Sequence, residues 1–169
     1  RLEFNLQGVD ANTGYTMKIS SSETFREPLL CLAAQTGNIE MAELLLEHGV
    51  DINRPSQWFC GAPVGVAARE GHWPMVAYLV ERGASAGDAI AGTAAANETE
   101  TLKFLLDHGA GPSSGIHAAA SHNAVDALRV LLDHGADPHV LDSRGATALD
   151  AAALARADDA YEFLASRGV

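Results

Sequence analysis

The stretch that decides the fold is Leu44-Leu45-Leu46-Glu47-His48-Gly49, an apolar run that ends in a glycine. Equivalent runs that end in glycine stand at residues 78–83, 104–109, 130–135 and 163–168. The five glycines lie 34, 26, 26 and 33 residues apart, and a pair of small residues upstream of each run keeps the same steps. Two markers with one spacing predict an array of repeated structural units.

Each repeat has the pattern of two short helices joined by a break. In the first repeat, Leu30, Ala33 and Ala34 share one helical face. Gly37 then breaks the helix, and Asn38 can cap the helix that follows. In later repeats the break position is held by Gly71, Asn97, Asn123 and Arg156. A left-handed backbone is expected at each break, which glycine and asparagine adopt readily and arginine adopts poorly.

The second helix of the first repeat carries its apolar residues on one side. We expect Met41 and residues 44–46 to face inward, and Gly49 to end the helix in a left-handed turn. Trp73 stands at the position that Ile39 holds here, so we expect its ring to pack in the core.

The repeat resembles that of the ankyrin family, whose unit of about 33 residues starts T-P-L-H-x-A-A and ends L-L-L-x-x-G-A-D-x-N. The repeat ends carry the likeness, at residues 49–53, 83–84, 109–110 and 135–137. The starts match less well: Thr147-Ala148-Leu149-Asp150 is nearest, and His117 holds the family's histidine position. The resemblance implies an all-α ankyrin-repeat solenoid of helix-turn-helix units over residues 27–169. It also implies a less stable stack than a consensus one, because most threonine and histidine ties between repeats are absent.

The steps between repeats predict where projecting hairpins, called fingers, stand. A full step leaves room for a finger, so we expect one after the first repeat and one after the fourth. The two steps of 26 residues leave no such room, and residues 83–88 and 109–114 are expected to be tight connectors.

Residues 1–26 do not fit the repeat and form an N-terminal extension. Apolar residues alternate at 2–6 and again at 15–19, with the turn-rich stretch 10–14 between them. This pattern predicts a β-hairpin, which would cover the open end of the first repeat. The alternative is flexible or foreign sequence before Met17. Because the chain begins with an arginine, we expect a fragment or a processed chain.

The composition excludes several classes of function. The chain has 22 acidic and 11 basic residues and a net charge of −11, whereas binding to nucleic acid or to an anionic membrane needs a basic face. No apolar run approaches the roughly 18 residues of a membrane-spanning helix, and no signal-peptide pattern opens the chain. Two cysteines, Cys31 and Cys60, cannot form a disulfide scaffold. We expect a cytoplasmic monomer that binds another protein, and a basic one if charge steers the encounter.

No set of residues with catalytic spacing is found. The sequence has no Gly-x-Ser-x-Gly elbow, phosphate-binding glycine loop, His-Glu-x-x-His or Cys-x-x-Cys. His48, His108 and His134 share one repeat position before the glycine, where an imidazole suits a helix C-terminus better than a metal site. We therefore expect no catalytic residues, no cofactor and no metal. An enzyme whose catalytic residues are dispersed along the sequence is a weaker hypothesis than a protein that binds or inhibits another protein.

The strongest binding signal is the pair Trp58 and Phe59, in the long first finger of a protein with few aromatic residues. Tryptophan is frequent in interface hot spots, and neighbouring strand residues point to opposite sides, so one ring should be exposed. The alternative is that a ring packs on the base of the finger. The candidate contacts of this finger are Arg54, Gln57, Trp58 and Phe59. By resemblance, a concave surface of first helices and inter-helix turns adds Gln35, Thr36, Arg69, Glu70, His72, Ser121 and His122, with Asn38, Ala95 and Leu154 at equivalent positions.

These patterns predict a non-enzymatic protein-interaction module, an ankyrin-repeat adaptor or scaffold that binds its partner through the concave face and the first finger. The alternative is an acidic inhibitor or immunity-type protein that occludes a basic partner such as a nuclease or toxin. The alternative predicts an association rate that falls steeply with added salt.

Overall fold

Of the 169 residues of the chain, the computed structural model describes 15–19, 23–27, 29–56 and 61–169. Contacts between residues divide the chain into two compact units, 1–84 and 85–169. Among the described residues, the first unit has a β-hairpin and four helices, and the second has six α-helices and one short 3-10 helix. The all-α helix-turn-helix architecture expected from the repeat is confirmed.

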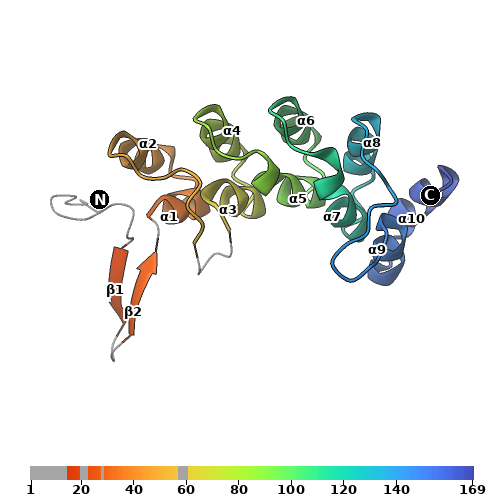
Figure 1. The fold of residues 1–169 in the computed structure, drawn as a ribbon, viewed down its shortest axis with the longest axis horizontal. Coiled ribbons are helices and arrows are strands. Elements are labelled where there is room, and N and C mark those ends of the chain that lie inside the picture. The colour runs from red at the N-terminus through yellow and green to blue at the C-terminus, as the bar shows by residue number, and fades with distance from the viewer. Residues whose placement is uncertain (1–14, 20–22, 28, 57–60) are drawn as a thin grey trace. The chain divides into compact units, whose positions relative to one another are not determined.

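In the first unit, two helix-turn-helix repeats follow the hairpin (Figure 1). Their helices are α1 (Leu29–Thr36), α2 (Ile39–Glu47), α3 (Pro63–Arg69) and α4 (Trp73–Glu81). The first helices α1 and α3 pack against each other, and each packs against its own second helix. The alanine pairs at 33–34 and 67–68 are buried, and such small side chains allow helices to approach closely. Leu30, Leu45 and Leu79 fill the core beside them.

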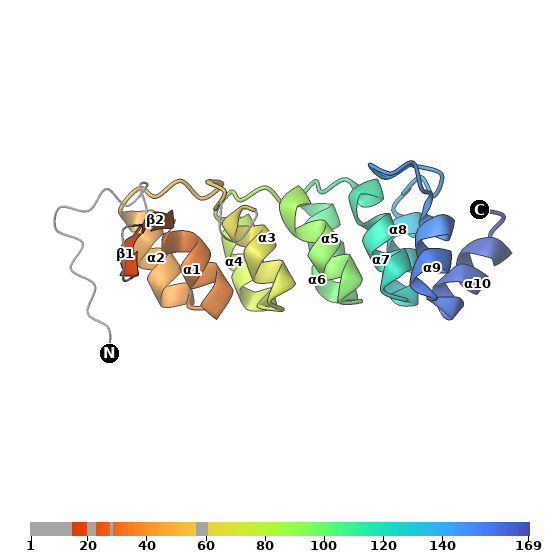
Figure 2. The same ribbon diagram turned by 90° about the horizontal axis from the view of Figure 1, so that it is seen from below.

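In the second unit, three repeats continue the same plan. Their helices are α5 (Gly87–Ala95), α6 (Thr99–Asp107), α7 (Ile116–Ser121), α8 (Val125–Asp133), α9 (Ala148–Ala155) and α10 (Asp158–Ser166), with the 3-10 helix η1 (Pro112–Gly115) before α7. The first helices α5, α7 and α9 pack side by side, and the second helices α6, α8 and α10 lie along them (Figure 2). Ile90, Leu105, Leu128 and Leu164 are fully buried between the two rows.

The hairpin pairs β1 (Tyr15–Ile19) with β2 (Glu23–Glu27) in antiparallel register. The strand expected at 15–19 is present, but the partner that the structure shows follows it in sequence. The segment 2–6, which the alternation pattern offered as the partner, lies outside the described residues. The pattern missed β2 because Phe25 is its only large apolar residue.

The lengths of the connections confirm the two fingers and the two tight connectors. Long connections follow α2 and α8, at 48–62 and 134–147, and are called the first finger and the second finger below. Only residues 82–86 separate α4 from α5, and only 108–111 separate α6 from η1. The two steps of 26 residues therefore lack a finger, as expected.

The breaks between first and second helices all adopt the left-handed backbone that the sequence predicts. The φ angles at the break positions are +65° at Gly37, +76° at Gly71, and +57° at Asn97, Asn123 and Arg156. Asn38 also caps α2 as expected, because its side chain accepts a hydrogen bond from the backbone N–H of Met41 at 2.9 Å.

Two expectations about core packing need correction. Leu44 was expected to face inward with its neighbours, but 43% of its surface is exposed while Leu45 is buried. Three consecutive residues span more than half of a helix circumference, so they cannot all face one core. The ring of Trp73 is partly buried rather than fully packed in the core.

Two asparagines at the breaks do more than turn the chain. The Asn97 side-chain oxygen accepts a hydrogen bond from the backbone N–H of Ala127, at 2.8 Å, in the first turn of α8. The Asn123 side chain does the same for Ala160 in α10, also at 2.8 Å. The residues that precede α8 and α10 are alanines without a capping group. Each of these helices is therefore capped by the preceding repeat, which ties neighbouring repeats together.

We predict that Asn123→Gly destabilises the second unit. Glycine keeps the left-handed backbone but removes the cap on α10 and the hydrogen bond that the Asn123 amide donates to Asp159 at 2.9 Å. The free energy of unfolding should therefore fall by about 1–2 kcal/mol. Asn97→Gly should behave alike. Urea unfolding of each variant measures the change, and an unchanged midpoint would show that the caps contribute nothing.

Substitution of Arg156 by glycine should instead stabilise the protein. Arg156 holds the same left-handed backbone, but no hydrogen bond of its side chain is seen to any described residue. Arg156→Gly relieves the backbone strain and should raise the free energy of unfolding by about 0.5–1 kcal/mol. Arg156→Lys, which keeps the strain, is the matched control. A loss of stability in Arg156→Gly would contradict the prediction.

Candidate functional site

His72, one of the expected contact residues, ties the first repeat to the second. Its ring Nε2 donates to the backbone oxygen of Gln35 at 2.9 Å, since a carbonyl can only accept. The ring also lies against Gly37, where an added Cβ would come within 2.8 Å of it. The close approach at this break thus needs both the glycine and the histidine.

The other expected residues of the first unit surround this tie. The Thr36 hydroxyl donates to the backbone oxygen of Leu32 in its own helix, at 3.0 Å. Arg69 and Glu70 follow at the end of α3, and both are exposed. The structure therefore brings Gln35 at the end of α1 together with His72 before α4, whereas the Thr36 side chain bonds within its own helix.

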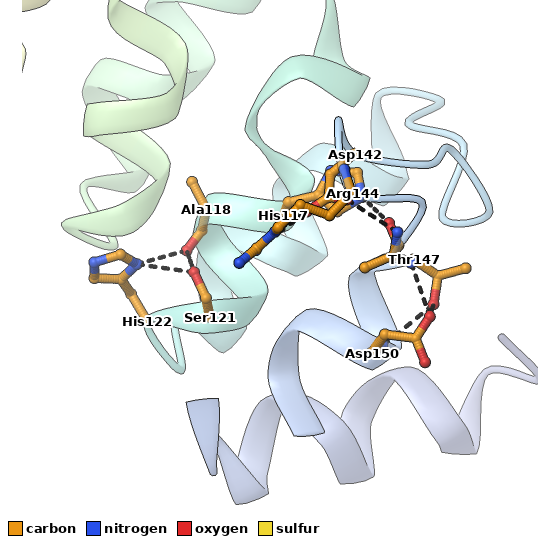
Figure 3. A network of polar contacts seen from close by, with 9 residues as sticks. His117, Ala118, Ser121, His122, Asp142, Arg144, Thr147 and Asp150 are labelled. Carbon is orange, nitrogen blue, oxygen red and sulfur yellow. Dashed lines mark hydrogen bonds and ion pairs between the residues drawn. The ribbon is translucent and has the colours of Figure 1, made fainter. Parts of the chain in front are cut away.

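Ser121 and His122 of the second unit end α7 as a small polar cluster (Figure 3). The ring Nδ1 of His122 donates to the backbone oxygen of Ala118 at 3.0 Å and lies 3.1 Å from the Ser121 hydroxyl. The hydroxyl itself donates to the same carbonyl at 3.2 Å. Because Nδ1 carries the proton in the neutral ring, Nε2 is left as the hydrogen-bond acceptor of His122.

Two backbone hydrogen bonds join the two sides of the first finger at its base. Ser56 and Gly61 exchange backbone hydrogen bonds of 2.9 and 3.3 Å as an isolated antiparallel bridge. The buried thiol of Cys31 lies beneath this base, 3.9 Å from the Gly61 oxygen. Arg54 is exposed. Gln57, Trp58 and Phe59 lie outside the described residues.

The second finger is held by one carboxylate (Figure 3). Asp142 accepts hydrogen bonds from the backbone N–H groups of Ala146 and Arg144, at 2.9 and 2.8 Å, and pairs with the Arg144 guanidinium at 3.2 Å. The two backbone donors, Ala146 first, hold the pKa of Asp142 below its ordinary value of 3.8. His117 on α7 donates from Nε2 to the Ala146 oxygen at 3.0 Å. The finger is therefore fastened to α7 by the histidine expected to tie repeats.

The second finger displays a residue that the sequence analysis missed. Leu141 precedes the central carboxylate and is 62% exposed. Beside it, the side chain of Arg144 is 76% exposed although it is paired. The signal was the apolar pair Val140-Leu141 in a mostly polar loop, but exposed apolar residues are common and carry little weight without the structure. On the first-helix side, Leu154 of α9 is also 73% exposed.

The three histidines at the repeat position before glycine act as expected at helix ends. His48, His108 and His134 each donate from Nδ1 to the carbonyl four residues earlier, at 2.7, 2.8 and 2.7 Å. They satisfy carbonyls that a helix C-terminus leaves unpaired. In the described part of the chain, no three His, Cys, Asp or Glu side chains are grouped so as to hold a metal ion.

Charge is distributed unequally between the two helices of a repeat. The exposed acidic residues of the second helices are Glu40, Glu43, Glu47, Glu81, Glu100, Asp107, Asp126, Asp133, Asp158, Asp159 and Glu162. The first helices carry only Arg69, Asp88 and Asp150 as charged residues. Each unit therefore has a nearly uncharged first-helix face and a strongly acidic second-helix face.

A family model for ankyrin repeats, in three copies, matches residues 3–90 and again 90–169. The chain belongs to the ankyrin-repeat family. Ankyrin repeats form a non-enzymatic fold whose general role is to bind other proteins. A comparison with curated proteins found no match. Among the residues that the structure describes, none of the ankyrin helices has the length and apolar character needed to span a membrane.

We predict that acid weakens the second unit through Asp142 and Asp150. The pKa of Asp150 is also lowered, first by the backbone N–H of Thr147 and then by its hydroxyl. Because both folded pKa values lie below the ordinary 3.8, the unfolded chain takes up protons first as the pH falls. The stabilisation that the two carboxylates give the folded state is therefore complete at pH values above the ordinary carboxyl pKa and is lost as the pH falls below it.

Urea unfolding at a series of pH values tests this prediction. Wild type should lose stability as the pH falls through the ordinary carboxyl value, and Asp142→Asn/Asp150→Asn should lose less. Equal losses in the two proteins would contradict the assigned roles. Unfolding curves of both proteins at neutral pH serve as the reference. The side-chain oxygens of the two introduced asparagines can still accept the backbone hydrogen bonds there.

Proposed function

We propose that this ankyrin-repeat protein binds a partner protein through the first-helix face and the finger of each unit. The family's general role supports binding as such. The nearly uncharged first-helix face supports the choice of surface, because charged residues are depleted at the centre of protein interfaces. The contacts of this surface are Gln35, Thr36, Arg69, Glu70, Ser121 and His122, with Arg54, Gln57, Trp58 and Phe59 from the first finger.

The observation that carries the proposal is the exposed Leu141 on a finger that is already ordered. Hydrogen bonds accepted by Asp142 and donated by His117 hold this loop, so little conformational entropy remains to be lost on binding. A leucine presented by an ordered loop suits an apolar pocket on the partner. We include Trp58 and Phe59 of the first finger because aromatic residues, tryptophan above all, are frequent in interface hot spots.

Substitution of the exposed leucine tests the proposal. The immobilised chain is used to isolate its binding protein from the source cells, and the affinity of the purified pair is then measured. Leu141→Ser should weaken binding by about tenfold or more if the residue is a hot spot. Leu44→Ser, an exposed leucine on a second helix, is the matched control and should change nothing. Full binding by both Leu141→Ser and Trp58→Ala/Phe59→Ala would refute the proposed surface.

A second candidate function is an acidic inhibitor that covers a basic protein such as a nuclease or toxin. The acidic second-helix face supports it, because like charges gathered on one side of a repeat steer a basic partner to that side. In this case Glu40→Gln/Glu43→Gln/Glu47→Gln on α2 should slow association, and Leu141→Ser should not. An association rate that does not change between low and high salt would exclude this function.

A further inference from the structure

The acidic second-helix face is interrupted in the last two repeats by two arginines around one ring. The guanidinium carbon of Arg129, on α8, lies 5.1 Å from the centroid of the Phe163 ring on α10. That of Arg167, at the C-terminal end of α10, lies 5.0 Å from the same centroid. The ring is partly buried, and both arginines are exposed. Two cations thus share one aromatic side chain, which attracts each through its π-electrons.

Neither arginine is neutralised within the described part of the chain. The ion pairs found there join Arg82 to Glu43, Lys103 to Glu100 and Arg144 to Asp142. No described carboxylate lies within 4 Å of Arg129 or Arg167. In a chain with a net charge of −11, these two guanidinium groups stand at one ring without a paired carboxylate among the described residues, so both can still bind an anion.

We propose that Arg129, Phe163 and Arg167 bind a phosphorylated segment of a partner protein. The charge of the site decides between anions: two cations match a phosphoryl group, which carries nearly two negative charges at neutral pH, better than they match one carboxylate. Planar guanidinium groups also pair with phosphate oxygens through two parallel hydrogen bonds. The ring gives an apolar surface for the chain that bears the phosphate.

The surroundings of the site restrict the segment further. Asp126 and Asp133 lie one turn before and one turn after Arg129 on α8, and Glu162 precedes Phe163 on α10. These acidic side chains repel an extended polyanion, and they attract basic residues. The ligand is therefore a single phosphoryl group with arginines or lysines beside it, and not a nucleic acid or a membrane surface.

Fluorescence anisotropy with a synthetic peptide tests the site. The probe is fluorescein-labelled Ala-Arg-Arg-Ala-phosphoserine-Ala-Arg-Ala, in buffer of about 50 mM ionic strength, where screening is modest. The intact chain should bind it. The same peptide with unmodified serine should bind about tenfold more weakly, because charge-assisted hydrogen bonds are lost. Equal binding of the two peptides, or no binding of the phosphopeptide, would overturn the proposal.

Variants assign the binding to these residues. Arg129→Gln and Arg167→Gln should each weaken phosphopeptide binding about tenfold, whereas Arg144→Gln, which removes an equal charge from a paired arginine, should leave it unchanged. An equal loss in Arg144→Gln would show that only net charge matters. The Arg129 side chain is exposed on α8, so Arg129→Gln should stay folded by circular dichroism even if the Arg167 variant does not.

A competition experiment separates a phosphorylated segment from free phosphate. Inorganic phosphate should displace the labelled peptide only at concentrations far above those of the unlabelled phosphopeptide, because it lacks the basic neighbours. Displacement at equal concentrations would show an ion site and would refute binding of a peptide. None of these outcomes depends on Leu141 or on the first-helix face, so the two proposals can fail separately.

Discussion

The left-handed break in each repeat is the constraint on which the rest of the structure depends. It ends the first helix, turns the chain and brings a side chain or a bare backbone against the next repeat. At Asn97 and Asn123 the amide caps a helix of the following repeat. At Gly37 the absence of a side chain admits the His72 ring instead, and that ring bonds to Gln35. An asparagine side chain and a glycine without one thus both allow neighbouring repeats to be joined at the break position.

The hydrogen bonds at the break positions replace some of the threonine and histidine bonds between repeats that this chain lacks. His117 still fills the tying role implied by the family, through its hydrogen bond to the second finger, whereas Thr147 caps its own helix α9. The remaining starts have alanine, glycine or cysteine at the position where the family carries its histidine. Stability between neighbouring repeats therefore depends on break-position hydrogen bonds and on close packing of alanine-rich first helices.

The repeat plan also separates two kinds of surface within each unit. First helices bury small residues and carry little charge, whereas second helices present acidic side chains to solvent. The first-helix face and the fingers suit an interface with a folded partner, and the acidic face suits electrostatic steering. Arg129 and Arg167 depart from this division, and for that reason they point to a separate ligand.

The sequence by itself determined the repeat count, the helix ends and the positions of the two fingers. Glycine and asparagine specify left-handed turns through their own backbone preferences, so Gly37, Asn97 and Asn123 could be assigned without a structure. Only the tertiary structure decided which side chains meet across repeats. Asn97 and Ala127 are thirty residues apart, and Asn123 and Ala160 are thirty-seven, because the finger between repeats varies in length. Contacts of this kind depend on how helices pack in space, and local preference or periodicity cannot specify them.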